Sequence, residues 1–318
     1  MASKHSAASK MPIFIGPEEC EKYLDLQELY RTLEGAFGSY SRGTTGGIIQ
    51  PVRTVLPVEK YEGFYGVMPV FSEKDNALGT KLVSFYSKNT DIATHQAVIV
   101  LNNASDGSVK AILDGGVITD IRTAMSSAVA TKVLKKSSSP MTLAILGAGA
   151  QAISHHKVFS KLFDLSEVRI WSRTFSKVEQ LSAQLGAKPC RSAEEAVKDA
   201  DVIVTATMSK TPILMAEWVK SGAHINSVGA CRPDWHEVDP ILMRKASVFC
   251  DSREAAAKES GDIILAEADI YAEIGEILNG TISHVGPDKT TVFKSLGMAI
   301  EDIVSAKLVY DNYIKENA

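Results

Sequence analysis

The spacing of hydrophobic and polar residues changes along the chain, and each spacing predicts a different kind of element. From about residue 12 to 40 the chain is expected to be helical, because apolar residues recur on one helical face, clearest in the set Leu26, Leu29, Tyr30, Leu33 and Phe37. Between residues 48 and 114, short β-rich runs are separated by Gly, Asn and Asp, which predicts a meander of antiparallel or mixed strands. The first part of the chain is therefore expected to be dominated by a sheet.

A different pattern follows. A helix is expected from Thr119 to about Leu134, where Ala, Ser and Val recur at helical spacing after a threonine that can cap the helix, and "KKSSSP" then forms a polar connector. After Pro140, apolar strands alternate with helices, which predicts crossover units and a parallel sheet; the strand runs are "TLAILG", "VRIWS", "DVIVTAT", "HINSVG" and "SVFCD". Residues 290–315 are expected to form one long amphipathic helix that packs back on the first domain.

A glycine motif lies directly after the first of these strands. Gly147, Gly149 and Ala152 form the pattern G-x-G-x-x-A between a strand and a helix. The first glycine permits a tight turn, the second lets the backbone approach a pyrophosphate, and the small third residue lets helix and strand pack closely. The alternative is a glycine turn that binds no nucleotide. The context favours a dinucleotide site.

The fold class follows from these patterns together. We expect an α/β protein with a Rossmann-like doubly wound parallel sheet and a second, discontinuous α+β domain. The predicted boundaries are 1–119 with 290–318 for a substrate and dimerisation domain, and 120–289 for the cofactor domain. A chain of 318 residues suits two such domains.

The end of the second strand predicts which dinucleotide binds. An Asp or Glu there would bind the 2′-hydroxyl of NAD, but the strand ends in Ser172, Arg173 and Thr174, with Lys177 one turn later. These side chains suit a 2′-phosphate, so NADPH is expected rather than NADH, although Arg173 is also compatible with a solvated loop arginine. The carboxyl ends of later strands add three probable neighbours of the cofactor by position: Thr207, Met208 and Val228.

Three cations of the first half are candidates for holding a substrate. Arg53, Lys81 and Arg122 occupy apolar or strand contexts, where Arg53 suits a carboxylate and Lys81 a polar reacting centre. Each alone is equally compatible with a charge on an edge strand or helix surface. His95 is a candidate for contacting cofactor or substrate, or simply a strand histidine. His155 and His156 are interpreted as surface or packing residues, and no metal is expected.

Composition and charge exclude several other functions. The chain is 45% hydrophobic and 23% charged with a net charge of -4, so no basic surface for nucleic acid or membrane is expected. No apolar run reaches the roughly 20 residues of a membrane span, and the opening "MASKHSAASK" is polar, which predicts a cytoplasmic protein without a signal peptide. The four cysteines are widely spaced without a CxxC pair, which favours reduced thiols over zinc or disulfides.

Motifs along nearly the whole chain resemble the ornithine cyclodeaminase and mu-crystallin family, and within it they resemble the mu-crystallins more than the cyclodeaminases. They are "QPVRTV", "TKLVSFY", "HQAV", "VITDIRTA", "ILGAGAQA", "WSRT", "GAHINSVGACRPDW", "AAAKESGDI" and "TTVFKSLGMAIEDIVSAKLVYD". The resemblance implies that Arg53, Lys81 and Arg122 surround a substrate carboxylate and the nicotinamide. It also implies that Glu259 lies near the ligand pocket. The remaining positions are implied to bind NADPH: His95, Gly147, Ala148, Gly149, Ala150, Gln151, Ser172, Arg173, Thr174 and Lys177.

Three residues of one loop depart from the family pattern, namely Cys231, Asp234 and Trp235, and Cys231 is the one that bears on the reaction. Cyclodeaminases and related alanine dehydrogenases carry an aspartate in a pattern like G-A-D-x-P-G-K-x-E, and Cys231 occupies that position here. Because a thiol is mostly uncharged at neutral pH, it cannot replace the carboxylate. No activating base or second thiol is identifiable nearby, which disfavours a nucleophile or a metal ligand. Cys231 is therefore interpreted as a neutral wall of the substrate cleft.

The resemblance implies an activity as well as a fold. The expected reaction is NADPH-dependent reduction of the C=N bond of cyclic ketimine carboxylates, namely piperideine-2-carboxylate, pyrroline-2-carboxylate and sulfur-containing ketimines, with Lys81 as the catalytic residue. Thyroid hormone is expected to bind in the same cleft, and the protein is expected to be a homodimer. Two alternatives stay open: a non-catalytic, NADPH-dependent hormone-binding protein or lens crystallin, and, less favoured, an ornithine cyclodeaminase.

Overall fold

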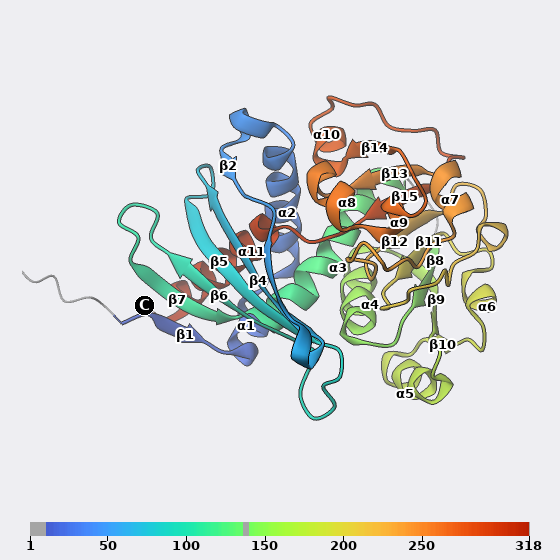
Figure 1. The fold of residues 1–318 in the computed structure, drawn as a ribbon, viewed down its shortest axis with the longest axis horizontal. Helices are drawn as coiled ribbons and strands as arrows, with labels where there is room; N and C mark the ends of the chain where they lie inside the picture. Colours follow the sequence, from blue (N-terminus) through green and yellow to red (C-terminus); the bar gives the residue numbers. More distant parts are fainter. Residues whose placement is uncertain (1–10, 136–139, 318) are drawn as a thin grey trace, which may run out of the picture. The chain divides into compact units, whose positions relative to one another are not determined.

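The computed structural model describes residues 11–135 and 140–317, which divide into two compact units (Figure 1). Unit 1 comprises the described parts of Met1–Asp25, Gly47–Thr119 and Ala299–Ala318; unit 2 comprises Leu26–Gly46 and the described parts of Asp120–Met298. The polar opening of the chain and most of the predicted connector lie outside the described residues. The boundaries proposed from the sequence stay a prediction.

Unit 1 is built on a mixed sheet in the order β1-β7-β6-β5-β4-β2, with β3 also pairing with β4. Its pairs are antiparallel except for β1 and β7, as the predicted meander requires. Its elements are β1 (Ile13–Ile15), α1 (Pro17–Tyr23), β2 (Ile48–Ile49), β3 (Thr54–Val58), η2 (Glu59–Tyr61), β4 (Gly63–Ser72), β5 (Ala77–Tyr86), β6 (His95–Asn102), β7 (Val109–Asp114) and α11 (Ala299–Asn317).

Alternation of side chains gives this sheet two different faces. In β5, Ala77, Gly79, Lys81 and Val83 are buried, whereas the residues between them are only half-buried. Because α11 packs across β4, β5 and β6, the buried set faces this helix (Figure 1). The start of α11 is tied to the loop before β3, since the Ile300 amide donates to Gln50 Oε1 at 2.7 Å.

Unit 2 is built on a parallel eight-stranded sheet in the order β10-β9-β8-β11-β12-β15-β13-β14, which confirms the predicted α/β fold. Strands β11, β12 and β15 are buried throughout, as expected for strands covered on both faces. The strands are β8 (Met141–Leu146), β9 (Leu165–Trp171), β10 (Lys188–Pro189), β11 (Val202–Thr205), β12 (His224–Ser227), β13 (Ser247–Cys250), β14 (Ile270–Glu273) and β15 (Thr291–Lys294).

Helices of two kinds accompany this sheet. Most connect successive strands, whereas α2 comes from the N-terminal part of the chain and α3 begins at the end of unit 1. The helices are α2 (Leu26–Tyr40), η1 (Gly43–Gly46), α3 (Gly115–Leu134), α4 (Ala150–Leu162), α5 (Phe175–Leu185), α6 (Ala193–Val197), η3 (Ala216–Trp218), α7 (Pro240–Lys245), α8 (Arg253–Glu259), α9 (Gly261–Ile264) and α10 (Ile274–Leu278). Within the described ranges, no helix is long and apolar enough to cross a bilayer.

The prediction of one helix over 290–315 is wrong in its first part. Residues 291–294 form β15 in the middle of the parallel sheet, and the helix begins only at Ala299. A run of four residues is too short to show a periodicity that separates a buried strand from a helix, so neighbouring strands decide the outcome. Gly297, at φ 79°, lies between the strand and the helix.

Two helix starts also differ from the prediction. Residues 13–15 form β1 because β7 offers them a parallel partner, so the helical region begins at Pro17. Helix α3 begins at Gly115 rather than at Thr119. The Asp114 carboxylate accepts from the Val117 amide at 2.8 Å, and it therefore caps the helix in place of the threonine.

Side-chain contacts explain why α2 belongs to unit 2. The hydroxyls of Tyr40 and Ser252 lie 2.8 Å apart, and Ser41 Oγ donates to Glu273 Oε2 at 2.7 Å. Beneath them, the ring of Phe37 meets that of Phe293 edge to face, with centroids 6.5 Å apart. These contacts link α2 to the part of the parallel sheet formed by β13, β14 and β15.

Candidate cofactor and substrate site

The turn after β8 has the geometry that a dinucleotide site needs. Gly147 has φ 143°, and a Cβ built on it would lie 2.5 Å from the carbonyl oxygen of Ala206. Its amide donates to the carbonyl of Trp171 at 2.8 Å, which holds the turn against the end of β9. Only glycine fits this position.

The next residues leave the start of α4 open. Gly149 and Ala150 are exposed, and a Cβ built on Gly149 would meet nothing within 4 Å. Gly149 caps α4 without a side chain, and the first turn of the helix carries no acidic residue. The free amides of this turn therefore fit a pyrophosphate. Gln151 Nε2 donates to Asp120 Oδ1 at 3.1 Å, which ties the turn to α3.

Cations rather than carboxylates follow β9. Arg173, Thr174 and Lys177 are exposed at the start of α5. The neighbouring strand adds a residue that the sequence did not single out, because β10 is only two residues long and gave no strand pattern. There Arg191 lies over the ring of Phe175, with 4.2 Å from its guanidinium carbon to the ring centroid. This edge of unit 2 therefore suits a phosphate beside an adenosine.

A buried carboxylate links the ends of β11 and β12. Glu237 is fully buried; its Oε1 accepts from the amide of Thr207 at 2.5 Å and from its hydroxyl at 2.6 Å. Its Oε2 accepts from the amide of Gly229 at 2.9 Å and the hydroxyl of Thr205 at 3.0 Å. A Cβ on Gly229 would lie 2.0 Å from Thr207 O, so the two strand ends meet at backbone contact. The predicted cofactor neighbours Thr207 and Val228 are thereby brought together.

Two further charges support Glu237. Asp262 Oδ1 accepts from the amides of Glu237 and Val238 at 2.7 and 3.1 Å, and its Oδ2 lies 3.3 Å from Lys294 Nζ. Burial, and then repulsion from Asp262, raise the pKa of Glu237 to about 7, although Lys294 and the Thr207 donors oppose this shift. The cluster was not identified from the sequence, although Glu237 is the final glutamate of the pattern G-A-D-x-P-G-K-x-E, because its members are far apart along the chain and meet only in the folded sheet.

The loop after β12 holds Cys231 in an exposed position, while Met208 is exposed at the end of β11. The amide of Gly261 donates to the carbonyl of Arg232 at 3.1 Å, which packs this loop onto the start of α9. The carboxylate of Asp234 forms an ion pair with Lys210, with 3.0 Å between Oδ2 and Nζ. Glu259 is half-buried at the end of α8.

In unit 1, Lys81 lies on the buried face of β5 with 2% of its surface exposed. Its Nζ lies 2.7 Å from Oδ2 of the fully buried Asp302 on α11, and it donates to Thr119 Oγ1 at 3.5 Å. A buried charge needs such a partner to remain charged. Asp302 was not identified from the sequence, because a helix surface pattern does not show which residue faces the sheet.

The other predicted residues are distributed over both units. Arg53 is half-buried just before β3, and His95 is half-buried at the start of β6. Arg122 is 4% exposed in α3, within unit 2, and a Cβ built on Gly297 would lie 2.6 Å from its Nη1. Each of these side chains has hydrogen-bonding or electrostatic partners.

Two histidines of unit 2 belong to a buried polar chain. His155 Nδ1 lies 2.7 Å from the Gln151 carbonyl and its Nε2 2.9 Å from Ser127 Oγ. His224 Nδ1 lies 2.8 Å from Thr291 Oγ1 and its Nε2 3.2 Å from Asn226 Oδ1. Burial lowers the pKa of His155 to about 4 and that of His224 to about 3, so both are neutral. His155 is therefore a packing histidine, one of the two roles expected for it.

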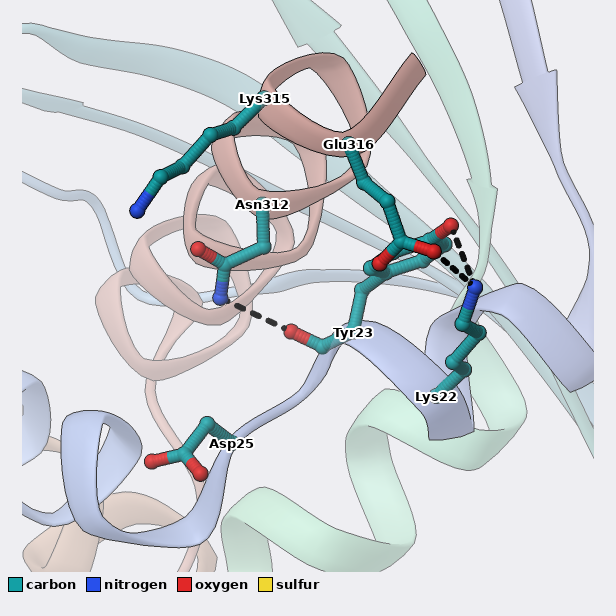
Figure 2. Close-up of a pocket in the computed structure, with 6 residues that line it drawn as sticks. All are labelled: Lys22, Tyr23, Asp25, Asn312, Lys315 and Glu316. Carbon is teal, nitrogen blue, oxygen red and sulfur yellow. Dashed lines mark hydrogen bonds and ion pairs between the residues drawn. The ribbon is translucent and has the colours of Figure 1, made fainter.

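A pocket of about 410 Å³ lies in unit 1, between the end of α1 and the last turns of α11 (Figure 2). Lys22 forms an ion pair with Glu316 across it, and Asn312 Nδ2 donates to the carbonyl of Tyr23 at 3.1 Å. These contacts tie the two helices together. The lining contains none of the residues predicted to bind cofactor or substrate.

Comparison with known proteins supplies a family and several relatives. The model of the ornithine cyclodeaminase/mu-crystallin family matches residues 12–317. The ketimine reductase mu-crystallin of Mus musculus is 52% identical over 309 residues, which cover 96% of this chain and 98% of that protein. The structure of Thermococcus litoralis Δ1-pyrroline-2-carboxylate reductase in complex with NADH and L-proline matches with a TM-score of 0.90 and 32% identity, covering 96% and 98% of the two chains. An archaeal alanine dehydrogenase dimer with bound NAD matches with a TM-score of 0.88 and 29% identity, covering 96% and 97%.

Proposed function

The chain belongs to the ornithine cyclodeaminase/mu-crystallin family, and on that premise we propose that it reduces the C=N bond of cyclic ketimine carboxylates with NADPH. The observation that carries this proposal is the 52% identity, over 96% of the chain, with a protein named ketimine reductase. The open glycine turn of unit 2 supports it, because that turn fits the pyrophosphate of a nicotinamide dinucleotide. Such a cofactor supplies the hydride.

The choice of NADPH rests on the edge of the sheet at β9. Arg173, Thr174 and Lys177 are exposed there, and no carboxylate follows the strand to bind a 2′-hydroxyl. Together with Arg191 they offer positive charge and hydrogen-bond donors to a 2′-phosphate. Tighter binding of NADH than of NADPH in a fluorescence titration would overturn this part of the proposal.

The side chains of the substrate site have distinct tasks. A guanidinium can hold a carboxylate with two parallel hydrogen bonds, which is the role of Arg53 and Arg122. When hydride adds to the imine carbon, the electron pair of the C=N bond moves to nitrogen, and the nitrogen needs one proton. The ammonium of Lys81, held by Asp302, holds or supplies that proton. Cys231 and Glu259 complete the substrate-binding set, and His95 contacts the cofactor.

Oxidation of NADPH with a panel of five- and six-membered ketimine carboxylates tests this function. Lys81→Met is expected to abolish turnover while NADPH still binds, because the variant keeps the glycine turn intact. Lys74→Met is the matched control, since Lys74 is an exposed lysine in the turn between β4 and β5. Full turnover in Lys81→Met would remove this lysine from the mechanism. Release of ammonia from ornithine, without ketimine reduction, would make the protein a cyclodeaminase.

We also propose that thyroid hormone binds in the same cleft as the ketimine. The support is similarity to mu-crystallin, together with a cysteine rather than an aspartate at the exposed position 231. Equilibrium dialysis of the hormone with and without NADPH, together with competition against ketimine turnover, tests it. Hormone binding without any ketimine turnover would favour the alternative of a non-catalytic hormone-binding protein or lens crystallin.

Apolar residues on one face of the unit 1 sheet support a homodimer. Phe14, Ile112, Val100 and Pro69 lie in one row across β1, β7, β6 and β4, with the polar Thr80 of β5 between Val100 and Pro69; Phe14 is 71% exposed and Val98, on the same face, is 39% exposed. Exposed apolar side chains on one sheet face are typical of a subunit interface. Light scattering of the wild type and of Val98→Glu tests the proposal; a monomeric wild type would refute it.

We propose that the protein acts in the cytoplasm on small molecules. All four cysteines are free, which agrees with a reducing compartment. The net charge of -4 offers no general attraction to nucleic acid or to anionic membranes.

A further inference from the structure

The order of strands in unit 2 divides the cofactor site into two halves. The glycine turn follows β8; β9 and β10 lie on one side of β8, and β11 and β12 lie on the other. The cations proposed to bind the 2′-phosphate follow the end of β9. In a doubly wound sheet the rest of the dinucleotide then extends over the ends of β11 and β12. The nicotinamide half of the cofactor therefore depends on the shape of these two strand ends.

Glu237 joins the two ends through its side chain, in addition to the amides of Val228 and Gly229, which donate to the Thr205 carbonyl at 2.9 and 3.2 Å. One carboxylate oxygen accepts from the Thr207 amide, and the other accepts from the Gly229 amide, each at 2.9 Å or less. Thr207 and Gly229 are half-buried at the surface of the site, whereas Glu237 is fully buried beneath them. Each carboxylate oxygen also accepts from a threonine hydroxyl, so both oxygens are needed to satisfy the four donors.

We propose that Glu237 is a positioning residue for the nicotinamide half of the cofactor, which it orders by holding the ends of β11 and β12 together. This inference rests on the proposed use of NADPH. It assigns the residue no contact with the substrate or with the reacting atoms. The adenosine half of the site, at the ends of β8 and β9, does not depend on Glu237.

The charges around Glu237 make this role sensitive to pH. The groups that face it are Asp262 from α9, Lys294 from β15, and the hydroxyls and amides of β11 and the loop after β12. A protonated carboxyl turns one of its acceptor positions into a donor, so it cannot satisfy all four donors at once. Since the pKa of Glu237 is raised to about 7, its carboxylate is intact above that pH and is lost as the pH falls below it.

The test compares two ligands on the same protein. Full-length NADPH uses both halves of the site, whereas adenosine 2′,5′-bisphosphate uses only the half at β9. In Glu237→Gln, affinity for NADPH is expected to fall about tenfold or more, because bonds to a charged acceptor are lost. Affinity for the bisphosphate is expected to stay within about twofold, as these bonds are remote from its site. Asp234→Asn is the matched control, because it removes an exposed carboxylate three residues away in the same loop.

The wild type provides a second readout that does not need a variant. The ratio of its affinities for NADPH and for the bisphosphate is expected to fall as the pH is lowered through about 7. All of these ligands carry the 2′-phosphate, so its titration cancels in the ratio. Adenosine 2′-monophosphate, measured at each pH as well, corrects for the 5′-phosphate of the bisphosphate, whose second pKa is roughly 6 and which in NADPH is part of a pyrophosphate. A ratio independent of pH, unchanged NADPH binding in Glu237→Gln, or an equal loss for both ligands would overturn the inference. If neither ligand binds the wild type, the proposed cofactor itself is wrong.

Discussion

Acidification is expected to destabilise unit 2 through its two buried histidines. His155 and His224 make hydrogen bonds with both ring nitrogens and lie at 0% exposure, so neither can take up a proton without leaving its partners or remaining desolvated. The carbonyl of Gln151 can only accept, which makes Nδ1 of His155 the donor in its neutral ring. The unfolded chain has no such restriction. Lowering the pH therefore favours unfolding.

The size of the effect follows from the pKa values. Both histidines have an ordinary value of 6.5, lowered to about 4 in His155 and about 3 in His224. Their stabilising effect is complete above about pH 6.5 and is lost as the pH falls toward the folded values. At about pH 5 only the unfolded chain is protonated, so each histidine costs about 2 kcal/mol, or about 4 kcal/mol for the pair.

Glu237 changes the stability of the fold with pH in the opposite direction to the histidines. Its pKa rises from 4.5 to about 7 on folding, so its contribution to stability is present at low pH and is lost as the pH rises through about 7. Acidification to about pH 5 therefore adds roughly 2.5 kcal/mol of stability through this group. The wild-type profile combines both effects, and a variant of one histidine is needed to separate them.

Urea unfolding of wild type and His224→Asn, followed by tryptophan fluorescence, measures the separate effect. All three tryptophans, Trp171, Trp218 and Trp235, lie in unit 2, so the signal reports the unit that holds the histidines. The variant is expected to be less stable near neutral pH, and this difference should shrink by about 2 kcal/mol at about pH 5. His284→Asn, which changes an exposed histidine, is the control variant. A difference between His224→Asn and wild type that does not change with pH would refute the reasoning.

Three further substitutions test other parts of the site. Gly147→Ala should destabilise the protein by about 3 kcal/mol in urea unfolding and should weaken NADPH binding, because φ is 143° at this residue and the carbonyl oxygen of Ala206 leaves no room for a Cβ. Normal NADPH binding would contradict the assignment of this turn to the pyrophosphate. Arg191→Ala should weaken NADPH about fivefold but leave NADH unchanged, as measured by fluorescence titration, and an equal effect on both would separate Arg191 from the 2′-phosphate. Cys231→Asp should lower the rate of ketimine reduction or hormone affinity, whereas unchanged turnover and binding would mean that the position matters little.

The sequence predicted those elements whose pattern is local. The strands of unit 1 alternate between a buried and an open face, and the glycine motif lies within one strand, turn and helix, so both were identifiable without partners. Strand β15 was not, because its four residues are all buried and therefore show no alternation between a buried and an open face. The parallel pairing of β1 likewise depends on β7, about a hundred residues away along the chain.

The same distinction between local patterns and long-range contacts applies to the residues of the site. Motifs and family resemblance selected the residues that face ligands, such as Lys81 and Arg173. They did not select Asp302, Glu237 or Lys294, which act on those residues or on the backbone around them. These supporting residues lie within the family motifs, but the motifs do not show which residue each of them contacts. Only the folded chain shows which oxygen lies within reach of which donor.

The position of β15 affects how the protein is made. This strand joins β12 to β13, yet it is the last strand to be synthesised, and α11 of unit 1 follows it. A nascent chain that ends before Thr291 therefore presents two unpaired edges at the centre of its sheet, and such edges readily pair with other chains. Neither unit can close until β15 and α11 have left the ribosome. Termination of synthesis before Thr291 should therefore produce aggregates rather than a folded cofactor domain.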